Sequence, residues 1–270
     1  MPASSLRQLL KFVRVFGVAG GVRLWLSIRG QLGRRLEMLT LAVPGYRNPI
    51  CLRPRDLPIF WQLMVMKEYA IDDLPQAAHI NEIYKQALAE GHPPLIVDCG
   101  SHVGLSAIWF ATCFPEALIY CIEPNSANLA LLEKNTAPYS KVTVLNGGVW
   151  GKSCSLTIAN PDAGSASFQL QEGSGKVGES SSLRSYTIDE VCSWKPGPLL
   201  AVKIDIEGAE AEVFAEPAPW MQQASIIAIE LHDWLLPGKQ TSRNLFRRLG
   251  ENTFDVIIRG ENLLLFQTTR

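Results

Sequence analysis

Hydrophobic positions from residue 94 onward fall into short runs that alternate with longer amphipathic segments. Strand-like apolar runs are expected at 95–97, 117–122, 142–145, 154–158, 199–204, 225–231, 254–258 and 263–266. Helices are expected between them, at 105–113, 126–135, 209–214 and 241–249. Apolar runs of this length that alternate with helices predict an α/β fold with a doubly wound sheet. Only residues 259–262 separate the last two runs, which favours a hairpin and therefore an antiparallel edge strand.

The first 58 residues follow another pattern. Apolar residues recur at three- and four-residue steps over 6–16, with basic residues in a separate stripe, and this predicts an amphipathic helix. Glycines at 17, 20 and 21 should end this helix, and a second helical segment is expected at 22–39. The prolines and the glycine of 41–58 predict a connector made of turns and short extended pieces.

The main domain should begin just after this connector. Two more helices are expected before the sheet, at 59–69 and 80–89. We therefore divide the chain into an N-terminal extension with its connector, residues 1–58, and a main domain, residues 59–270. Within that domain, residues 160–182 are rich in serine and glycine and should form a long loop.

Charge separates the same two parts. The whole chain has a formal net charge of −1, and 47% of its residues are hydrophobic, which is enough to bury a large core. Residues 1–60 hold ten basic and two acidic residues, a net charge of +8, whereas the other 210 residues hold 15 basic and 24 acidic residues, a net charge of −9. This balance excludes a globally basic nucleic-acid binder, and we expect no nucleic-acid partner.

The basic extension has two interpretations. In one, residues 1–40 make peripheral contact with an anionic membrane surface. In the other, they form a cap that packs on the main domain and leaves its arginines in water. The sequence supports both, and it does not reveal the oligomeric state.

Cysteine usage and the N-terminus bear on the compartment. The six cysteines show no C-x-x-C spacing, so we expect no zinc site, and we expect reduced thiols in a cytoplasmic protein. No apolar run reaches the ~20 residues that a transmembrane helix needs. Arginine and lysine interrupt the apolar start, which disfavours a secretory signal, although an arginine-rich start without acids also fits a mitochondrial transit peptide.

The first candidate site follows the first strand of the main sheet. Asp98 is followed there by Gly100 and Gly104, at the carboxyl end of the strand, where α/β sheets bind ligands. Glycines let the backbone turn tightly and approach a ligand. The spacing differs from the G-x-G-x-x-G of dinucleotide-binding proteins, and an ordinary strand-to-helix turn is the alternative.

The second candidate is Glu123, at the end of the next strand and 19 residues after Gly104. A carboxylate at this position can accept two hydrogen bonds from ribose hydroxyls. A solvated acid at the end of a strand is the alternative. Together, Glu123 and the glycine loop favour a nucleoside-binding site.

A third group of polar residues follows two later strands. Asp205, Glu207 and Glu210 lie within six residues, and Glu230 and His232 share one side of a strand because the side-chain period is two. His232 titrates near neutral pH and is the candidate general base. The alternatives are a structural role for His232 and a helix N-cap role for Asp205 or Glu207.

These motifs, in this order, resemble the FkbM family of S-adenosylmethionine-dependent methyltransferases. The matching segments are residues 97–104, Glu123-Pro124-Asn125, residues 186–191 and Lys203-Ile204-Asp205-Ile206-Glu207-Gly208-Ala209-Glu210, of which the last is the most specific. The resemblance covers roughly residues 50–268. Family members mostly have asparagine where this chain has His102.

The resemblance implies a class I methyltransferase fold, a Rossmann-like α/β sheet of seven strands with an antiparallel edge strand, preceded here by the helical extension. It implies that S-adenosylmethionine is the cofactor. The residues it places around the cofactor are Tyr69, Asp98, Gly100, Ser101, Gly104, Glu123 and Pro124. Of these, Asp98, Gly100 and Ser101 would surround the methionine part, Glu123 would hold the ribose, and Tyr69 would close over the site.

The expected reaction is methyl transfer to a hydroxyl of a sugar, a glycolipid or polysaccharide, or a natural product. Transfer from a sulfonium is an in-line displacement, so the enzyme must align the acceptor oxygen and remove its proton. Asp205, Glu207 and His232 are the expected catalytic residues, and the acids would alternatively hold a divalent cation. Two other functions stay open, a nucleotide-dependent oxidoreductase and a non-catalytic binding module on a methyltransferase scaffold.

Overall fold

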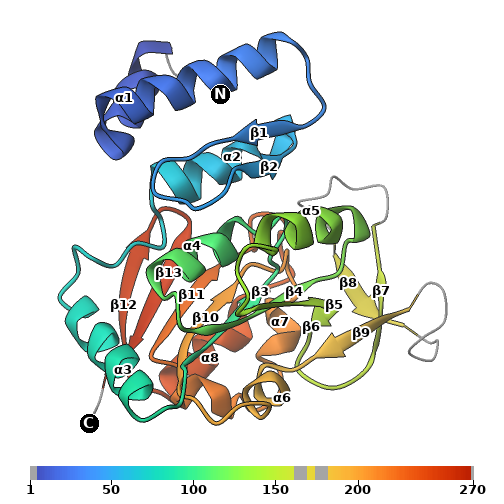
Figure 1. Cartoon of the computed structure of the whole chain (residues 1–270). Coiled ribbons are helices and arrows are strands. Elements are labelled where there is room, and N and C mark those ends of the chain that lie inside the picture. Colours follow the sequence, from blue (N-terminus) through green and yellow to red (C-terminus); the bar gives the residue numbers. More distant parts are fainter. Residues whose placement is uncertain (1–4, 161–168, 174–181, 269–270) are drawn as a thin grey trace.

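A seven-stranded sheet forms the centre of the computed structural model, which describes residues 5–160, 169–173 and 182–268 (Figure 1). Its strand order is β12-β13-β11-β10-β3-β4-β5. The strands are β3 (Leu95–Cys99), β4 (Leu118–Glu123), β5 (Val142–Asn146), β10 (Leu199–Ile204), β11 (Ile226–Glu230), β12 (Phe254–Arg259) and β13 (Asn262–Gln267). The strands from β11 to β5 pair in parallel, whereas β13 pairs antiparallel with β11 and with β12. The doubly wound sheet with an antiparallel edge is therefore confirmed.

Helices cover both faces of this sheet. They are α3 (Ala77–Ala89), α4 (Leu105–Cys113) and α5 (Ser126–Thr136) on one face, and α6 (Ile188–Cys192), α7 (Glu210–Val213) and α8 (Arg243–Gly250) on the other. Within β3, Ile96 packs into the first of these layers and its neighbour Val97 into the second. Because both faces are covered, the central strands are apolar at most successive positions, and this made them visible in the sequence.

The N-terminal extension is a bent helix, α1 (Ser5–Gly33), whose two halves meet at Gly17. Only this glycine breaks the helix, since its φ and ψ of 74° and 168° are not helical. The predicted break at Gly20 and Gly21 is wrong, because both continue the helix. At Gly21 a side chain would lie 2.5 Å from the backbone of Phe12, so the missing side chain lets the two halves pack closely. The second half ends at residue 33, six residues before the predicted end.

A short hairpin and a helical turn connect α1 to the main domain. Strands β1 (Leu39–Leu41) and β2 (Ile50–Leu52) form the extended pieces expected in the connector. A 3₁₀ turn (Pro54–Asp56), α2 (Leu57–Phe60) and a π-helical turn (Trp61–Val65) follow. The helix predicted over 59–69 therefore ends at residue 65, and Tyr69 lies beyond it.

A second, small sheet lies beside the main one. Its order is β6-β9-β7-β8, with β6 (Gly148–Val149), β7 (Ser155–Ile158), β8 (Leu170–Glu172) and β9 (Leu183–Tyr186). The apolar run at 154–158 forms β7 here and not a strand of the main sheet. Of the loop expected at 160–182, residues 161–168 and 174–181 lie outside the described residues, and β8 falls between them.

The extension packs on the main domain through one of its faces. Phe12, Leu24 and Ile28 are buried in the same hydrophobic cluster as Leu105 of α4 and Leu132 of α5. Figure 1 shows α1 lying across the end of the molecule, above β1, β2 and α2. In the part of the chain that the structure describes, no helix combines the length and the apolar character needed to span a bilayer. All six cysteines are unpaired thiols.

Candidate active site

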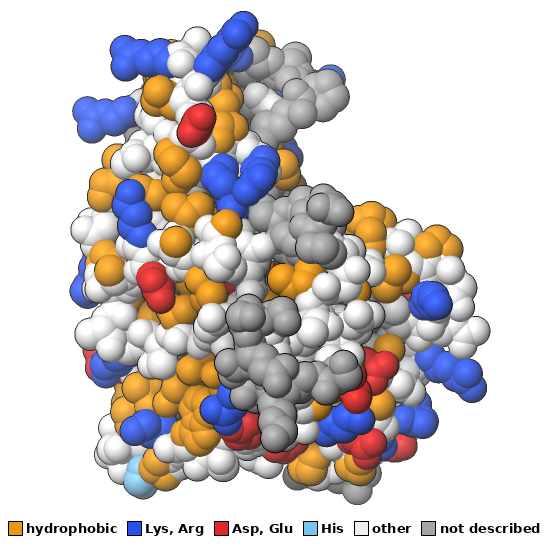
Figure 2. Space-filling model, turned by 90° about the vertical axis from the view of Figure 1, so that its right-hand side faces the viewer, with side chains coloured by type: hydrophobic (Ala, Val, Ile, Leu, Met, Phe, Trp, Pro, Cys, Tyr) orange, Lys and Arg blue, Asp and Glu red, His pale blue; other side chains and the backbone are white. Residues whose placement is uncertain are grey.

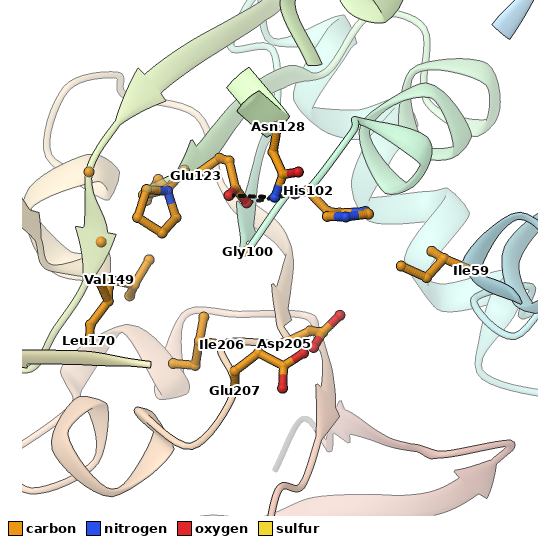
Figure 3. Close-up of a pocket in the computed structure, with 14 residues that line it drawn as sticks. Ile59, Gly100, His102, Glu123, Asn128, Val149, Leu170, Asp205, Ile206 and Glu207 are labelled. Carbon is orange, nitrogen blue, oxygen red and sulfur yellow. Dashed lines mark hydrogen bonds between the residues drawn. The ribbon is translucent and has the colours of Figure 1, made fainter. Parts of the chain in front are cut away.

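The loops that follow β3, β4, β10 and β11 meet at the carboxyl edge of the main sheet. Two adjoining cavities open there, with about 570 Å³ and about 710 Å³ of empty space, their open mouths included. The cavities share Ile59, Gly100, His102, Asp205 and Glu207, so they form one elongated site. Figure 3 shows the first cavity with Glu123 and Asn128 on one side and Asp205 and Glu207 on the other.

The glycine loop after β3 wraps around the end of β4. The backbone N–H groups of Gly100 and Ser101 both donate to the Ile122 carbonyl, at 3.0 and 3.1 Å. Gly100, His102 and Gly104 have positive φ angles, of 80°, 49° and 87°. Three such residues within five positions coil the chain tightly and bring its backbone to the wall of both cavities. The predicted backbone role of this loop fits that geometry.

Glu123 lies at the wall of the first cavity and is already well hydrogen-bonded. Its Oε2 accepts the backbone N–H of His102 at 2.8 Å, and its Oε1 accepts from the backbone of Asn125 and the side chain of Asn128, both at 3.0 Å. Burial raises the pKa of Glu123, while these three donors work in the opposite direction. The donors fix the carboxylate, and a carboxylate has about four acceptor positions, so at least one stays open to a ligand in the cavity.

Three residues near this carboxylate were not predicted from the sequence. Arg53, in the connector, donates to Asn128 Oδ1 at 2.7 Å, and Asp56 holds the same guanidinium at 2.8 Å. The Arg53–Asp56 pair is nearly inaccessible to water, since its side chains are 12% and 2% exposed. The hydrogen bond from Arg53 to Asn128 joins segments 75 residues apart, and no local sequence pattern predicts such a contact. The short spacing from Glu123 to Asn128, by contrast, can be read from the sequence.

His102 lies between the connector and the cavity. Its Nε2 is 3.3 Å from the Arg53 guanidinium and 3.6 Å from Asp56 Oδ1. Burial and the neighbouring arginine lower the pKa of His102 to about 4, against the opposing effect of Asp56. The imidazole is therefore neutral at neutral pH, and its side chain and backbone both line the site.

Beneath the loop lies a buried charge network. Lys203 donates to the Gly100 carbonyl at 2.6 Å and lies 3.5 Å from Asp98 Oδ1 and 3.4 Å from Asp205 Oδ2. Asp98 also accepts a hydrogen bond from the Ser106 hydroxyl at 2.6 Å. Asp98 is fully buried and lines neither cavity, so in this structure it supports the loop through Lys203 and has no cavity-facing atom.

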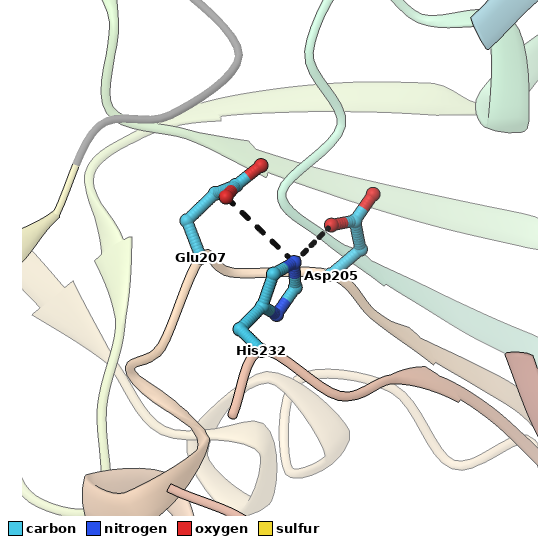
Figure 4. Close-up of side chains that lie close together, drawn as sticks. All are labelled: Asp205, Glu207 and His232. Carbon is cyan, nitrogen blue, oxygen red and sulfur yellow. Dashed lines mark ion pairs between the residues drawn. The ribbon is translucent and has the colours of Figure 1, made fainter. Parts of the chain in front are cut away.

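A cluster of acids surrounds His232 at the other side of the site (Figure 4). The buried Nδ1–H donates to Glu210 Oε1 at 2.8 Å, and Nε2 lies 3.6 Å from Asp205, 3.7 Å from Glu207 and 3.8 Å from Glu230. Asp205, Glu207 and Glu230 line the second cavity, whereas His232 stands behind them. Neither Asp205 nor Glu207 caps α7, whose first turn follows Ala209.

The acids around His232 determine its charge. Burial alone would lower the pKa of His232, but its hydrogen bond to Glu210 and the nearby carboxylates raise it to about 9. Burial raises the pKa of Glu207 to about 7. Burial and the nearby charge of Asp205 together raise the pKa of Glu230 to about 8. An imidazole that is protonated at neutral pH cannot accept a proton, and a carboxyl group with a pKa near 8 is also mostly protonated there, so each of these groups acts as a base only in its deprotonated form.

The structure thus brings most of the predicted residues together. Those that line the cavities are Tyr69, Gly100, Ser101, Glu123, Pro124, Asp205 and Glu207. Tyr69 stacks on Phe110, with ring centroids 5.8 Å apart, at the wall of the second cavity. Asp98, Gly104 and His232 lie one layer behind the lining, where they shape or support it. Their predicted direct roles stay predictions.

A family model described as "Methyltransferase FkbM domain" matches residues 98–256, more than half of the chain. No curated protein matches the sequence.

Several solved structures resemble the chain at low identity. The precorrin-6y C5,15-methyltransferase of Geobacter metallireducens is 11% identical with a TM-score of 0.37, over 66% of this chain and 81% of that one. TYW2 of P. horikoshii, solved in complex with MeSAdo, is 11% identical with a TM-score of 0.34, over 85% and 69%. An rRNA methylase of Streptococcus thermophilus is 11% identical with a TM-score of 0.38, over 68% and 93%. Likeness at this level says nothing about substrate.

Proposed function

The chain belongs to the FkbM methyltransferase family, and from that premise we propose that it is an S-adenosylmethionine-dependent O-methyltransferase. We propose a hydroxyl of a sugar, a glycolipid or polysaccharide, or a natural product as its acceptor. The observation that carries the proposal is the pair of joined cavities at the carboxyl edge of a class I methyltransferase sheet. A fixed carboxylate, Glu123, lines one cavity, and an acidic cluster lines the other.

The first cavity has the chemistry that a nucleoside needs. Its apolar walls, Ile122, Val149, Leu170 and Ile206, suit the flat face of an adenine ring. Glu123 would accept hydrogen bonds from ribose hydroxyls with the acceptor capacity that its three donors leave open. The backbone of the glycine loop would lie along the methionine part, toward Tyr69 and the second cavity.

The second cavity would hold the acceptor hydroxyl. When bound, the cofactor supplies an electrophilic methyl group on a positively charged sulfur. The acceptor oxygen would form its bond to that carbon as the carbon–sulfur bond breaks, and the hydroxyl proton would pass to a carboxylate of this cavity. We assign that step to Glu230 in its ionised form, because its carboxyl group lines the second cavity alone, whereas Asp205 and Glu207 line both cavities.

Cofactor binding tests the proposal directly. Calorimetry should show binding of S-adenosylmethionine and none of NAD. Glu123→Gln should weaken binding about 100-fold, since hydrogen bonds to a charged group contribute about 1.5–3 kcal/mol each. Glu116→Gln, the same change at an exposed acid outside both cavities, should leave affinity unchanged. Tight NAD binding without S-adenosylmethionine binding would favour an oxidoreductase instead.

Turnover distinguishes an enzyme from a binding module. Labelled methyl transfer to a panel of sugars, glycolipids and natural-product alcohols should identify an acceptor. With it, Glu230→Gln should lower kcat about 100-fold and leave the cofactor Kd unchanged, because a general base acts only in the transition state. Glu261→Gln, at a second acid of the same cavity, should retain most of kcat. Equal kcat in wild type and Glu230→Gln would remove Glu230 as the base.

We also propose that the outer face of α1 contacts an anionic membrane, on the cytoplasmic side. Seven of the thirteen most exposed large hydrophobic side chains of the described residues lie in 6–38, including Leu6 at 64%, Leu10 at 58% and Val18 at 72% exposure. Seven exposed basic residues and one exposed acid share this segment. Figure 2 shows Lys and Arg side chains projecting from that end of the molecule, with hydrophobic side chains between them. Apolar side chains among cations are typical of helices that lie in a bilayer interface.

Co-sedimentation with vesicles tests this contact. Binding to vesicles that contain phosphatidylglycerol should exceed binding to pure phosphatidylcholine and should fall as salt rises. The double variant Arg7→Gln/Arg14→Gln should bind about 30-fold more weakly, at about 1 kcal/mol per basic residue. Lys85→Gln/Lys195→Gln removes the same charge from exposed sites elsewhere and should bind like wild type. Equal and salt-insensitive recovery on both vesicles would leave only the role of a cap.

A further inference from the structure

The cluster around His232 has an arrangement that hydrogen bonding within the protein does not account for. His232 is 1% exposed, and its Nε2 points at Asp205 and Glu207 (Figure 4). The nearest carboxylate oxygen is 3.6 Å away, which is too long for a hydrogen bond. Among the described residues Nε2 therefore has no hydrogen-bond partner, although three carboxylates face it.

The other imidazole nitrogen is firmly held. Nδ1–H donates at 2.8 Å to a carboxyl oxygen of Glu210, a residue that is fully buried. This bond fixes the orientation of the ring and directs the Nε2 atom into the cluster. A carboxylate that holds the far nitrogen of a histidine is the usual second layer of a metal site.

The distances from His232 to the two carboxylates are compatible with a shared cation. One oxygen of Asp205, one oxygen of Glu207 and one nitrogen of His232 all lie within 4.8 Å of one another. Two ligand atoms that each lie about 2.1 Å from one ion are about 3.0 Å apart at right angles and about 3.4 Å apart in a tetrahedron. The separations of 3.6 and 3.7 Å from Nε2 are close to these values.

The charge of this cluster also favours a bound cation. Five carboxyl groups meet in this region, those of Asp98, Asp205, Glu207, Glu210 and Glu230, and Lys203 and His232 are the two basic side chains paired with them in the described chain. A partly buried group of acids with so little positive charge is stabilised by a bound cation.

We propose that Asp205, Glu207 and His232 bind one divalent first-row transition-metal cation. Two carboxylates and an imidazole suit Mn²⁺, Fe²⁺ or Zn²⁺, whereas Mg²⁺ prefers a shell made entirely of oxygen. The two carboxylates line both cavities, so the remaining coordination positions face the junction where the cofactor's methyl group and the acceptor would meet. His232 is then a ligand rather than the general base, and Glu210 is the residue that positions it.

The role of the cation rests on the proposed function, whereas its binding does not. An acceptor hydroxyl bound to the cation would lose its proton more easily. The proton would pass to Glu230, the oxygen would form its bond to the methyl carbon, and the carbon–sulfur electron pair would stay on sulfur as the neutral thioether. Charge and atoms balance without any further reactant.

Binding of Mn²⁺ to the full chain, stripped with EDTA, tests the site. The electron paramagnetic resonance signal of free Mn²⁺ should fall as the ion binds, with about one ion per chain. Bound Mn²⁺ should show nitrogen coupling from an imidazole, and His232→Gln should abolish that coupling. Asp205→Asn and Glu207→Gln, at partly exposed side chains that can be replaced without leaving a buried charge, should each weaken binding strongly.

Two further variants separate a positioned ligand from general damage. Glu210→Gln should weaken Mn²⁺ binding about 10- to 100-fold while the nitrogen coupling persists, which is the usual effect of losing the residue behind a metal ligand. His79→Gln changes an exposed histidine on α3 and should alter neither affinity nor coupling. Thermal melts without metal will show that each variant is folded.

The outcomes distinguish this site from the proposed function. No Mn²⁺ binding up to millimolar concentration, or equal binding by wild type and Asp205→Asn, would overturn the site. Full methyl transfer in EDTA by a chain that binds no Mn²⁺ would also overturn it and leave the methyltransferase intact. One Mn²⁺ bound with imidazole coupling, in a chain that methylates no acceptor, would support the site while the proposed activity fails.

Discussion

Lys203→Met should lower the free energy of unfolding by about 3–5 kcal/mol, the usual cost of removing one partner from a buried ion pair. Lys203 is 3% exposed, and its ammonium group lies within 3.5 Å of carboxylate oxygens on Asp98 and Asp205. Burial would lower the pKa of Lys203, but these two charges outweigh it and raise the pKa well above its usual value. Without the lysine, Asp98 would keep a buried charge with only the Ser106 hydroxyl as a donor. Urea unfolding would measure the loss.

The matched variants identify the cause of that loss. The double variant Lys203→Met/Asp98→Asn removes both charges, so it should recover a large part of the stability, with a coupling energy of about 1–3 kcal/mol. Lys195→Met changes an exposed lysine and should alter stability by less than about 0.5 kcal/mol. If the stability losses of Lys203→Met and Asp98→Asn simply added up in the double variant, the two side chains would not be coupled. The ion pair would then not be the source of the stability loss.

The main sheet could be predicted from the sequence because its strands are buried on both faces. Residues such as Ile96 and Val97 face opposite layers and are both apolar, so the run stands out from its surroundings. The small sheet lacks this property. In β9, Arg184 is exposed while Ser185 is buried, so polarity does not indicate which side faces inward. Its pairing depends on the neighbouring segments and not on its own pattern.

The extension shows the same limit in a helix. The spacing of Leu6 and Leu10 correctly predicts a helix, but both side chains are exposed, and Phe12 faces the domain instead. Which face is buried depends on the bend at Gly17 and on the position of β1 and β2. Periodicity gives the type of element, and tertiary packing chooses the face.

The site was predictable where chemistry follows position. Carboxylates at the carboxyl ends of parallel strands meet at one edge of the sheet. This rule alone predicts that Glu123 and Asp205 lie in one site. What lies behind that lining could not be predicted. The bond from His232 to Glu210 and the one from Lys203 to the Gly100 carbonyl join segments 22 and 103 residues apart. Sequence spacing carries no information about such pairs until the strands are ordered in space.

Gly100→Ala should abolish detectable S-adenosylmethionine binding and lower the free energy of unfolding by about 2–5 kcal/mol. Gly100 has a φ of +80°, where a side chain costs about 1–2 kcal/mol. An added Cβ would lie 1.9 Å from the carbonyl oxygen of Asp205, a clash that only a shift of the loop or of the end of β10 can relieve. Overpacking of this kind adds about 1–3 kcal/mol. The shift would displace the loop backbone and Asp205 together, and both line the two cavities.

Gly91→Ala separates backbone strain from the clash. Gly91 has a similar φ of +75°, but an added Cβ there meets no atom within 4 Å. It should therefore cost only about 1–2 kcal/mol and leave the affinity for S-adenosylmethionine unchanged. Urea unfolding and calorimetry on both variants would measure the difference, which is the effect of the contact with Asp205. Equal losses of stability in the two variants, or wild-type cofactor binding in Gly100→Ala, would mean that the loop does not need this close approach to hold the cofactor.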